Sequence, residues 1–188
     1  MFLSAARAWW MLNFFGHERV SVLSGGLKSW LAISGATDSG PLAQAKKGGF
    51  TSRPAIGAQV ISIDSLSQLI ENGTAGQIAD ARSPGRFAGI DPEPRAGLRA
   101  GHMPGASNVP IMNLIDKEGA LRPKEEIAEV FVNAGIDCKK SVITTCGSGI
   151  TACGLALALA ILGNENVTVY DGSWSEWGAS DAPIRKSA

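Results

Sequence analysis

The sequence predicts an α/β fold with a mainly parallel sheet and helices on both faces. From residue 58 onward, short runs of β-branched and apolar residues alternate with longer helical segments, which is the pattern of successive βα units. Apolar residues make up 45 % of the 188-residue chain, enough for the core of an ordinary domain. Parallel strands joined by helices need both sheet faces covered, so a layered architecture follows.

The individual elements can be assigned from periodicity and from helix-end signals. The predicted strands are 60–62, 77–80, 107–109, 141–145 and 167–170. Three predicted helices are 65–71, capped by Asp64 or Ser65; 123–133, opened by Pro123 and ended by Gly135; and 151–162, which is apolar throughout.

Composition excludes several classes of protein. Lysine plus arginine equals aspartate plus glutamate, 17 of each, so no net charge attracts nucleic acid or an anionic membrane. The three cysteines contain no CxxC pair and the two histidines are far apart, which argues against a disulfide scaffold and against a structural zinc site. Arg7 interrupts the apolar N-terminus, and no segment reaches the length of a membrane span. We therefore expect a reducing, cytoplasmic location and neither nucleic acid nor membrane as a partner.

An internal repeat relates the two ends of the chain. Residues 16–25 reappear as 163–172 without a gap, and at the same offset Trp30 falls on Trp177. We interpret 1–40 as the remnant of a truncated N-terminal domain, 41–57 as a linker, and 58–188 as the complete domain. Because the first segment is rich in aromatic residues, we expect residues 1–33 to pack on the complete domain or to drive self-association.

The strongest chemical signal is Cys146. It follows a predicted buried strand and opens the loop Cys146-Gly147-Ser148-Gly149, after which a helix begins. Ligands of parallel sheets bind at the carboxyl ends of strands, glycines let successive N–H groups turn inward, and a helix N-terminus adds positive potential. This arrangement stabilises a thiolate, so Cys146 is the predicted nucleophile. A buried structural cysteine is the alternative, and we assign that role to Cys138 and Cys153.

Several motifs resemble the rhodanese superfamily of sulfurtransferases, and within it the catalytic domains of the mercaptopyruvate type. The motifs are CGSGITA, DARSPGRFAG, EPR, GHMPGASNVP and GSWSEW. The resemblance implies a rhodanese-like parallel five-stranded sheet, preceded by a partial copy of a second rhodanese domain, with no metal and no organic cofactor. It also implies transfer of sulfane sulfur from 3-mercaptopyruvate, through a Cys146 persulfide, to a thiol acceptor such as thioredoxin or to cyanide.

The resemblance also assigns roles to individual residues. Ser148 joins Cys146 as a catalytic residue that polarises the departing group or relays a proton to it. Arg86 and Arg95 bind the substrate carboxylate, since charge-assisted contacts of this kind are strong. His102 is expected to organise the loop by hydrogen bonding, not to act as a catalyst. The remaining predicted members of the active-site loop are Gly147, Gly149, Ile150 and Thr151.

The sequence leaves two other interpretations open and argues against a third. The donor could be thiosulfate in place of mercaptopyruvate. The chain could also be a truncated, weakly active module that binds sulfur compounds or a protein partner. A cysteine phosphatase shares the anion-binding loop but needs an arginine six positions after the cysteine, where this chain has Ala152.

Overall fold

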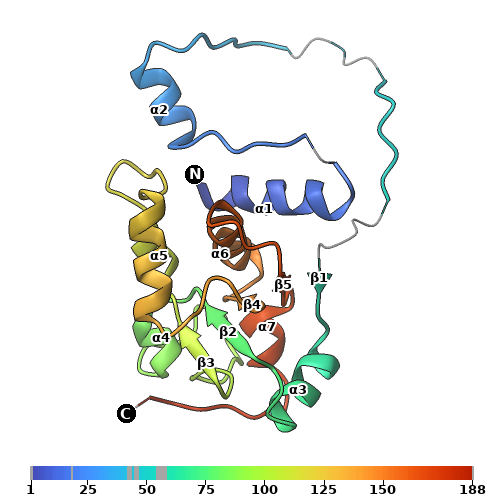
Figure 1. Cartoon of the computed structure of the whole chain (residues 1–188), viewed down its shortest axis with the longest axis vertical. Coiled ribbons are helices and arrows are strands. Elements are labelled where there is room, and N and C mark those ends of the chain that lie inside the picture. The colour runs from blue at the N-terminus through green and yellow to red at the C-terminus, as the bar shows by residue number, and fades with distance from the viewer. Residues whose placement is uncertain (1, 18, 42–43, 45–46, 54–58, 188) are drawn as a thin grey trace.

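A parallel sheet forms the centre of the molecule, as the sequence predicted. The computed structural model describes residues 2–17, 19–41, 44, 47–53 and 59–187. Four strands of three or four residues make up the body of the sheet, and a two-residue strand adds to one edge. In chain order the strands are β1 (Gln59–Val60), β2 (Gln77–Asp80), β3 (Ala106–Asn108), β4 (Val142–Thr145) and β5 (Val167–Val169). Their spatial order is β1-β5-β4-β2-β3, and every pair is parallel (Figure 1).

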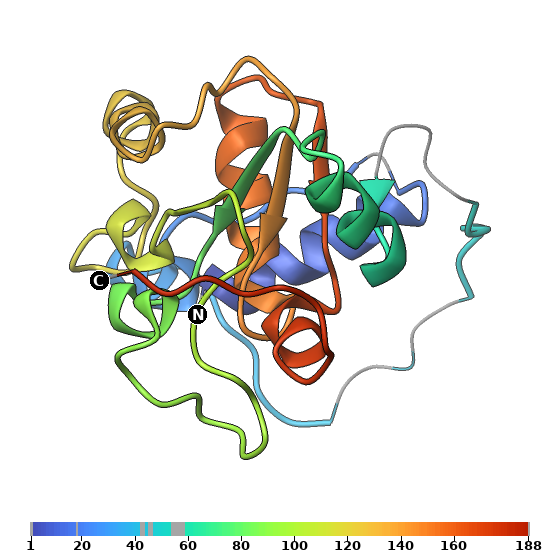
Figure 2. The same cartoon turned by 90° about the horizontal axis from the view of Figure 1, so that it is seen from below.

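Helices cover both faces of this sheet (Figure 2). One core cluster joins the sheet to α1, α5, α6 and the short 3-10 helix η1, and a second joins it to α3 and α7. Alternate residues of β4 enter the two clusters, Val142 the first and Ile143 the second, because strand side chains alternate between faces. The helices are α1 (Phe2–Phe14), α2 (Gly26–Ala32), α3 (Ile63–Glu71), α4 (Pro84–Ala88), η1 (Ile111–Leu114), α5 (Lys124–Asn133), α6 (Ile150–Ile161) and α7 (Ser173–Trp177). The predicted α/β class is therefore confirmed.

Most predicted boundaries lie within one residue of those observed, but the start of α3 differs. This helix begins at Ile63, and its cap is Ser62, whose hydroxyl accepts the N–H of Ser65 at 3.3 Å. The predicted caps Asp64 and Ser65 are wrong. Ser62 was assigned to the preceding strand, but that strand ends at Val60, which leaves the Ser62 hydroxyl free to satisfy an unpaired N–H of the first turn.

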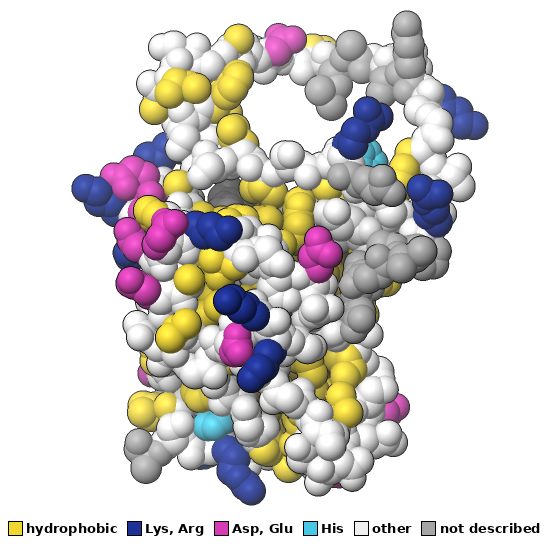
Figure 3. All heavy atoms as spheres, viewed as in Figure 1, with side chains coloured by type: hydrophobic (Ala, Val, Ile, Leu, Met, Phe, Trp, Pro, Cys, Tyr) yellow, Lys and Arg dark blue, Asp and Glu magenta, His cyan; other side chains and the backbone are white. Residues whose placement is uncertain are grey.

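The N-terminal segment is only partly attached to the domain. Helix α1 lies across α6, with Ala6 and Trp10 buried in the shared core cluster (Figure 1). Helix α2 has no buried residue, and hydrophobic side chains gather over it at the upper left of Figure 3. Residues 20–22 correspond at the offset of the internal repeat to strand β5 (Val167–Val169), but they form no strand. Strand β5 is paired on both edges, whereas this segment has no neighbouring strand.

Part of the predicted linker, residues 42–43, 45–46 and 54–57, lies outside the described residues. Among the residues that are described, no helix has both the length and the hydrophobicity needed to cross a lipid bilayer.

Replacing Trp10 tests the attachment of α1. Trp10→Ala should lower the free energy of unfolding by about 3 kcal/mol, because it opens a cavity between α1 and α6. Trp30→Ala is the matched control: Trp30 is 37 % exposed in α2, so its loss should cost less than about 1 kcal/mol. Urea unfolding of the two variants measures both values, and equal losses would show that α1 contributes no more to the core than α2 does.

Candidate active site

The loop that follows β4 places Cys146 at the carboxyl edge of the sheet. Cys146 is only 1 % exposed and lies beneath the loop backbone. Its Sγ accepts a hydrogen bond from the N–H of Ser148 at 3.4 Å. Gly149 then turns the chain into α6 with φ of 79°, a left-handed conformation that glycine adopts without strain.

The start of α7 determines which way the loop peptides face. The N–H of Trp174 donates to the carbonyl of Cys146 at 2.8 Å, and the N–H and hydroxyl of Ser175 donate to the carbonyl of Gly147 at 2.9 and 2.6 Å. In a trans peptide the N–H points opposite to the C=O. Holding these two carbonyls toward α7 therefore turns the N–H groups of Gly147 and Ser148 to the opposite side, and the Ser148 contact with Sγ agrees with this.

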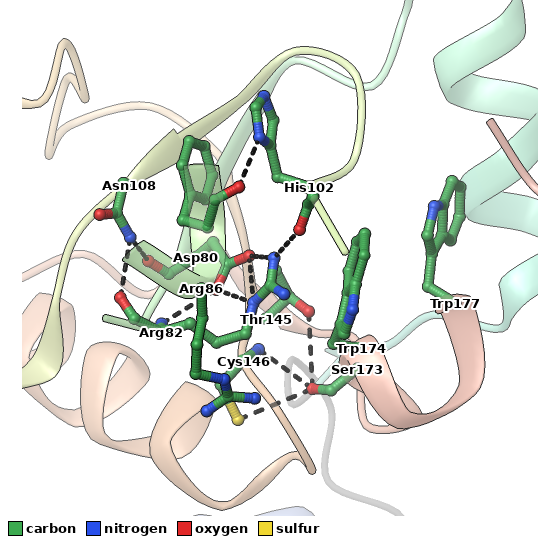
Figure 4. A network of polar contacts seen from close by, with 12 residues as sticks. Asp80, Arg82, Arg86, His102, Asn108, Thr145, Cys146, Ser173, Trp174 and Trp177 are labelled. Carbon is green, nitrogen blue, oxygen red and sulfur yellow. Dashed lines mark hydrogen bonds and ion pairs between the residues drawn. The ribbon is translucent and has the colours of Figure 1, made fainter. Parts of the chain in front are cut away.

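The expectation that successive N–H groups of the loop turn inward to the sulfur is only partly confirmed. Ser148 donates directly to Sγ, but the N–H groups of Cys146 and Gly149 donate instead to the hydroxyl of Ser173, at 3.1 and 3.0 Å. Ser173 donates in turn to the carbonyl of Tyr170 at 2.9 Å. Figure 4 shows this hydroxyl directed toward Cys146, with its Oγ 3.8 Å from the sulfur.

Ser173 is a site residue that the sequence analysis missed. It is fully buried, and its φ of 51° lies in the left-handed region. Its oxygen accepts two loop amides, and its one hydrogen has two acceptors within reach, the carbonyl of Tyr170 and the sulfur of Cys146, so this hydroxyl shapes the loop. A signal existed: at the offset of the internal repeat Ser173 falls on Gly26, whose φ is 62°. A serine replacing a glycine at a left-handed position indicates that its hydroxyl has a local role.

Both predicted arginines lie beside the loop. A cavity of about 210 Å³ is lined by Arg86, Glu93, Pro94, Arg95, Leu98, Gly147, Ser148 and Ser175. The guanidinium of Arg86 lies against Gly147, where a Cβ would approach its Nη2 to 2.9 Å. Arg95 donates to the hydroxyl of Ser175 at 2.6 Å. The structure thus brings Arg86, Arg95, Gly147 and Ser148 together at one opening, whereas Cys146, the residue before Gly147, is buried and does not line it.

A buried ionic network supports this cavity from beneath. Arg82 pairs with Asp80 at 2.7 Å and with Glu93 at 2.9 Å, and its guanidinium lies 4.0 Å from the ring centroid of Trp174. Glu93 also binds Arg86 at 2.5 Å. Charges this deeply buried persist only when they are paired and hydrogen-bonded. Arg82 therefore has a structural role, and it fixes Glu93, which positions Arg86 at the cavity.

His102 does not contact the cysteine loop through any of its observed hydrogen bonds. Its Nδ1 is 2.8 Å from the carbonyl of Phe87, and its ring stacks on Phe87 with centroids 3.9 Å apart. The expectation that His102 organises the loop by hydrogen bonding is thus wrong. It stabilises α4 instead, and α4 carries Arg86 as the residue before Phe87.

The two other cysteines lie in apolar or half-buried settings. The thiol of Cys153 donates to the carbonyl of Gly149 at 3.2 Å, and burial raises its pKa to about 11. Burial also raises the pKa of Cys138, which is half-buried. Both side chains are therefore neutral thiols at neutral pH, a poor state for nucleophilic attack.

These features define a class: a parallel α/β domain with a cysteine in a loop at the carboxyl end of a central strand, where the next residues of the loop line a cavity that also holds two arginines. The family model of the rhodanese-like domain matches residues 62–180. The chain belongs to the rhodanese family.

Individual relatives extend the similarity to nearly the whole chain. The 3-mercaptopyruvate sulfurtransferase of Escherichia coli K12 is 44 % identical over 96 % of this chain and 63 % of its own length. The thiosulfate sulfurtransferase of Rattus norvegicus is 38 % identical over 92 % of this chain and 58 % of its own length. The crystal structure of SseA from Escherichia coli, described as a 3-mercaptopyruvate sulfotransferase with the rhodanese fold, superposes with a TM-score of 0.77 at 39 % identity, over 93 % of this chain and 64 % of SseA. The chain thus spans less than two thirds of the length of these relatives.

Removing the Ser173 hydroxyl tests its role in the loop. Ser173→Ala leaves two buried N–H groups without an acceptor, so the free energy of unfolding should fall by about 2–3 kcal/mol. Ser83→Ala is the control, because that exposed serine makes no capping hydrogen bond at the start of α4. Denaturant unfolding measures both, and a Ser173→Ala variant as stable as the Ser83 control would contradict the role assigned to the hydroxyl.

Proposed function

We propose that the chain is a sulfurtransferase that moves sulfane sulfur from 3-mercaptopyruvate, through a persulfide on Cys146, to a thiol acceptor or cyanide. The observation that carries the proposal is the orientation of the loop: α7 holds the carbonyls of Cys146 and Gly147, and the N–H of Ser148 faces the sulfur. An amide-lined site of this kind favours an anionic sulfur. The 44 % identity to a 3-mercaptopyruvate sulfurtransferase supports the choice of donor.

In the first step, the Cys146 thiolate attacks the sulfur of 3-mercaptopyruvate and an S–S bond forms. The C–S bond of the donor breaks, and its electron pair passes to the methylene carbon as the enolate of pyruvate. That carbon takes up a proton, and pyruvate leaves. The exposed side chain of Ser148, two residues from the cysteine, is the loop hydroxyl available to polarise the departing group or relay this proton.

In the second step, the persulfide gives up its outer sulfur. An acceptor thiolate, such as that of thioredoxin, or cyanide attacks the outer sulfur, and Cys146 leaves as the thiolate. The N–H of Ser148 and the N-terminus of α6 stabilise the negative charge before and after transfer. Both half-reactions therefore use the same loop. Each ends with an anionic sulfur on Cys146, the persulfide after the first and the thiolate after the second, and the loop stabilises both.

The arginines are the proposed carboxylate site. Arg86 is a quarter exposed at the cavity and anchored by Glu93, and exposed Arg95 is anchored by Ser175. Anchoring lowers the conformational freedom that each side chain loses when it binds a ligand. A carboxylate held between the two guanidinium groups would direct the donor sulfur into the loop above Cys146.

We also propose a division of the chain into three segments. Residues 1–40 are the end of an N-terminal rhodanese-like domain, 41–57 form a linker, and 58–188 are the catalytic domain. The internal repeat supports this division, and so does the family model, which matches only within the last of these segments. The exposed apolar surface of α2 supports self-association through residues 1–33. None of the three cysteines, all within the described residues, forms a disulfide bond, which fits a reducing, cytoplasmic location.

Two alternatives rest on specific observations. The 38 % identity to a thiosulfate sulfurtransferase keeps thiosulfate open as the donor. The near-complete burial of Cys146 favours a weakly active module that binds sulfur compounds. Turnover with the two donors, measured on the same preparation, distinguishes these candidates, since the weakly active module would turn over both donors only slowly.

Persulfide formation is the direct test of the proposed nucleophile. After exposure to 3-mercaptopyruvate, mass spectrometry should show one additional sulfur atom on the peptide that contains Cys146. Cys146→Ser should abolish the added mass, while Cys153→Ser should retain it, because Cys153 is a buried thiol with a raised pKa. Added sulfur on Cys153 or Cys138 instead of Cys146 would contradict the assignment.

Substituting the arginines tests the carboxylate site. Arg86→Gln should raise KM for 3-mercaptopyruvate about tenfold, because a charge-assisted contact contributes about 1.5 kcal/mol or more. Arg95→Gln should raise it less, since Arg95 is more exposed to solvent. Arg122→Gln, which removes an exposed ion pair with Glu126 in α5, is the control and should leave KM unchanged. Steady-state kinetics measure all three; an Arg86 variant with wild-type KM would exclude this side chain from donor binding.

A further inference from the structure

One side chain of the N-terminal segment reaches the cysteine loop. Arg7, in α1, forms a bidentate ion pair with Asp171, which follows β5. The same guanidinium lies 3.5 Å from the carbonyl of Gly149 and 3.7 Å from the sulfur of Cys153. It is also 4.9 Å from the ring centroid of Trp10, one turn along α1. A residue from the first 40 thus contacts the end of the loop that holds Cys146.

Asp171 lies directly against this loop. A Cβ built on Gly149 would be 2.5 Å from its Oδ1, so the carboxylate is packed on the backbone of the last loop residue. An unpaired carboxylate at this place would oppose an anionic sulfur on the same loop. Arg7 supplies the opposite charge, and the hydrogen bond to Asp171 raises the pKa of Arg7, which keeps the guanidinium charged.

Arg7 also contacts the peptide that begins α6. Its Nη1 and the thiol of Cys153 both approach the carbonyl of Gly149, at 3.5 and 3.2 Å. The N–H of the same peptide belongs to Ile150 and points the opposite way. Contacts on the Gly149 carbonyl therefore favour the orientation in which the Ile150 N–H faces the loop.

We propose that Arg7 is a positioning residue for sulfur transfer, which neutralises Asp171 and holds the Gly149 peptide so that the loop stabilises an anionic sulfur on Cys146. The proposal rests on the function proposed above. It adds that helix α1 supplies a residue that positions the cysteine loop. Its contribution is electrostatic, so it differs from the packing contribution of Trp10 in the same helix.

The other carboxylates near the loop are already paired, and Arg95, the one cation at the cavity bound to a hydroxyl and not to a carboxylate, is unchanged in every variant described below. Arg86 faces the loop from α4 and is bound to Glu93, and Glu93 is shared with the buried Arg82–Asp80 pair. Cys153, from α6, has a pKa raised by burial to about 11 and is therefore an uncharged thiol near neutral pH. Loss of Arg7 therefore leaves Asp171 as the one carboxylate without an ion-pair partner among these described groups.

A charge cycle tests the proposal without requiring turnover. The rate of Cys146 alkylation by iodoacetamide, followed by peptide mass spectrometry, is measured against pH. Arg7→Gln should move the pH midpoint upward by about half to one unit, because an adjacent carboxylate opposes thiolate formation. Asp171→Asn should move it downward, since an unpaired guanidinium then remains. The double variant should return most of the way to the wild-type midpoint.

The exposed Arg122–Glu126 pair provides the matched control, and Arg122→Gln with or without Glu126→Gln should leave the midpoint unchanged. If Arg7→Gln lowers the stability to urea but does not move the midpoint, Arg7 has a structural role only and the proposal is overturned. A downward shift in Arg7→Gln, or a double variant no closer to wild type than Arg7→Gln, overturns it as well. Failure of the wild-type chain to form a persulfide would count against the proposed function. The pH midpoints of Cys146 alkylation could still be compared between the variants, so the role of Arg7 would still be tested.

Discussion

The contact between the first residues of α7 and the cysteine loop is the constraint on which the site depends. Two backbone N–H groups and one hydroxyl hold the carbonyls of Cys146 and Gly147, and peptide planarity then directs the opposite N–H groups toward the sulfur side. The buried hydroxyl of Ser173 takes up the amides that do not face the sulfur. The loop is thereby oriented before any ligand arrives, which is the condition for electrostatic stabilisation to contribute to a rate.

The buried charges of the domain connect this loop to the cavity above it. Arg82 stacks on Trp174, the residue whose N–H binds Cys146, and pairs with Glu93, the residue that anchors Arg86. One guanidinium thus links the element that orients the loop with the element that carries a proposed substrate ligand. Removing a single member of such a network leaves an unpaired buried charge, so the parts of the site are expected to be strongly coupled in stability.

The N-terminal segment has two different relations to the domain. Helix α1 is integrated: Trp10 fills the core over α6, and Arg7 reaches the end of the cysteine loop. Helix α2 is not, because Leu27, Leu31 and Ile33 remain mostly exposed. At the offset of the internal repeat Leu27 corresponds to Trp174 of α7, which is fully buried. An apolar position that the two copies share is thus core in one and surface in the other, since α7 packs on the sheet and α2 does not.

The sequence by itself determined the α/β class, the order of the elements and the place of Cys146, because these follow from local periodicity and from the rule that ligands meet parallel sheets at the strand ends. It also indicated Arg86 and Arg95, which the structure places at one cavity. It did not show that Ser173 accepts the loop amides, that His102 binds α4, or that Arg7 reaches Asp171. Each of those contacts joins residues from 15 to 164 positions apart, and only the tertiary structure decided them, because hydrogen-bond partners at such separations depend on how whole elements pack.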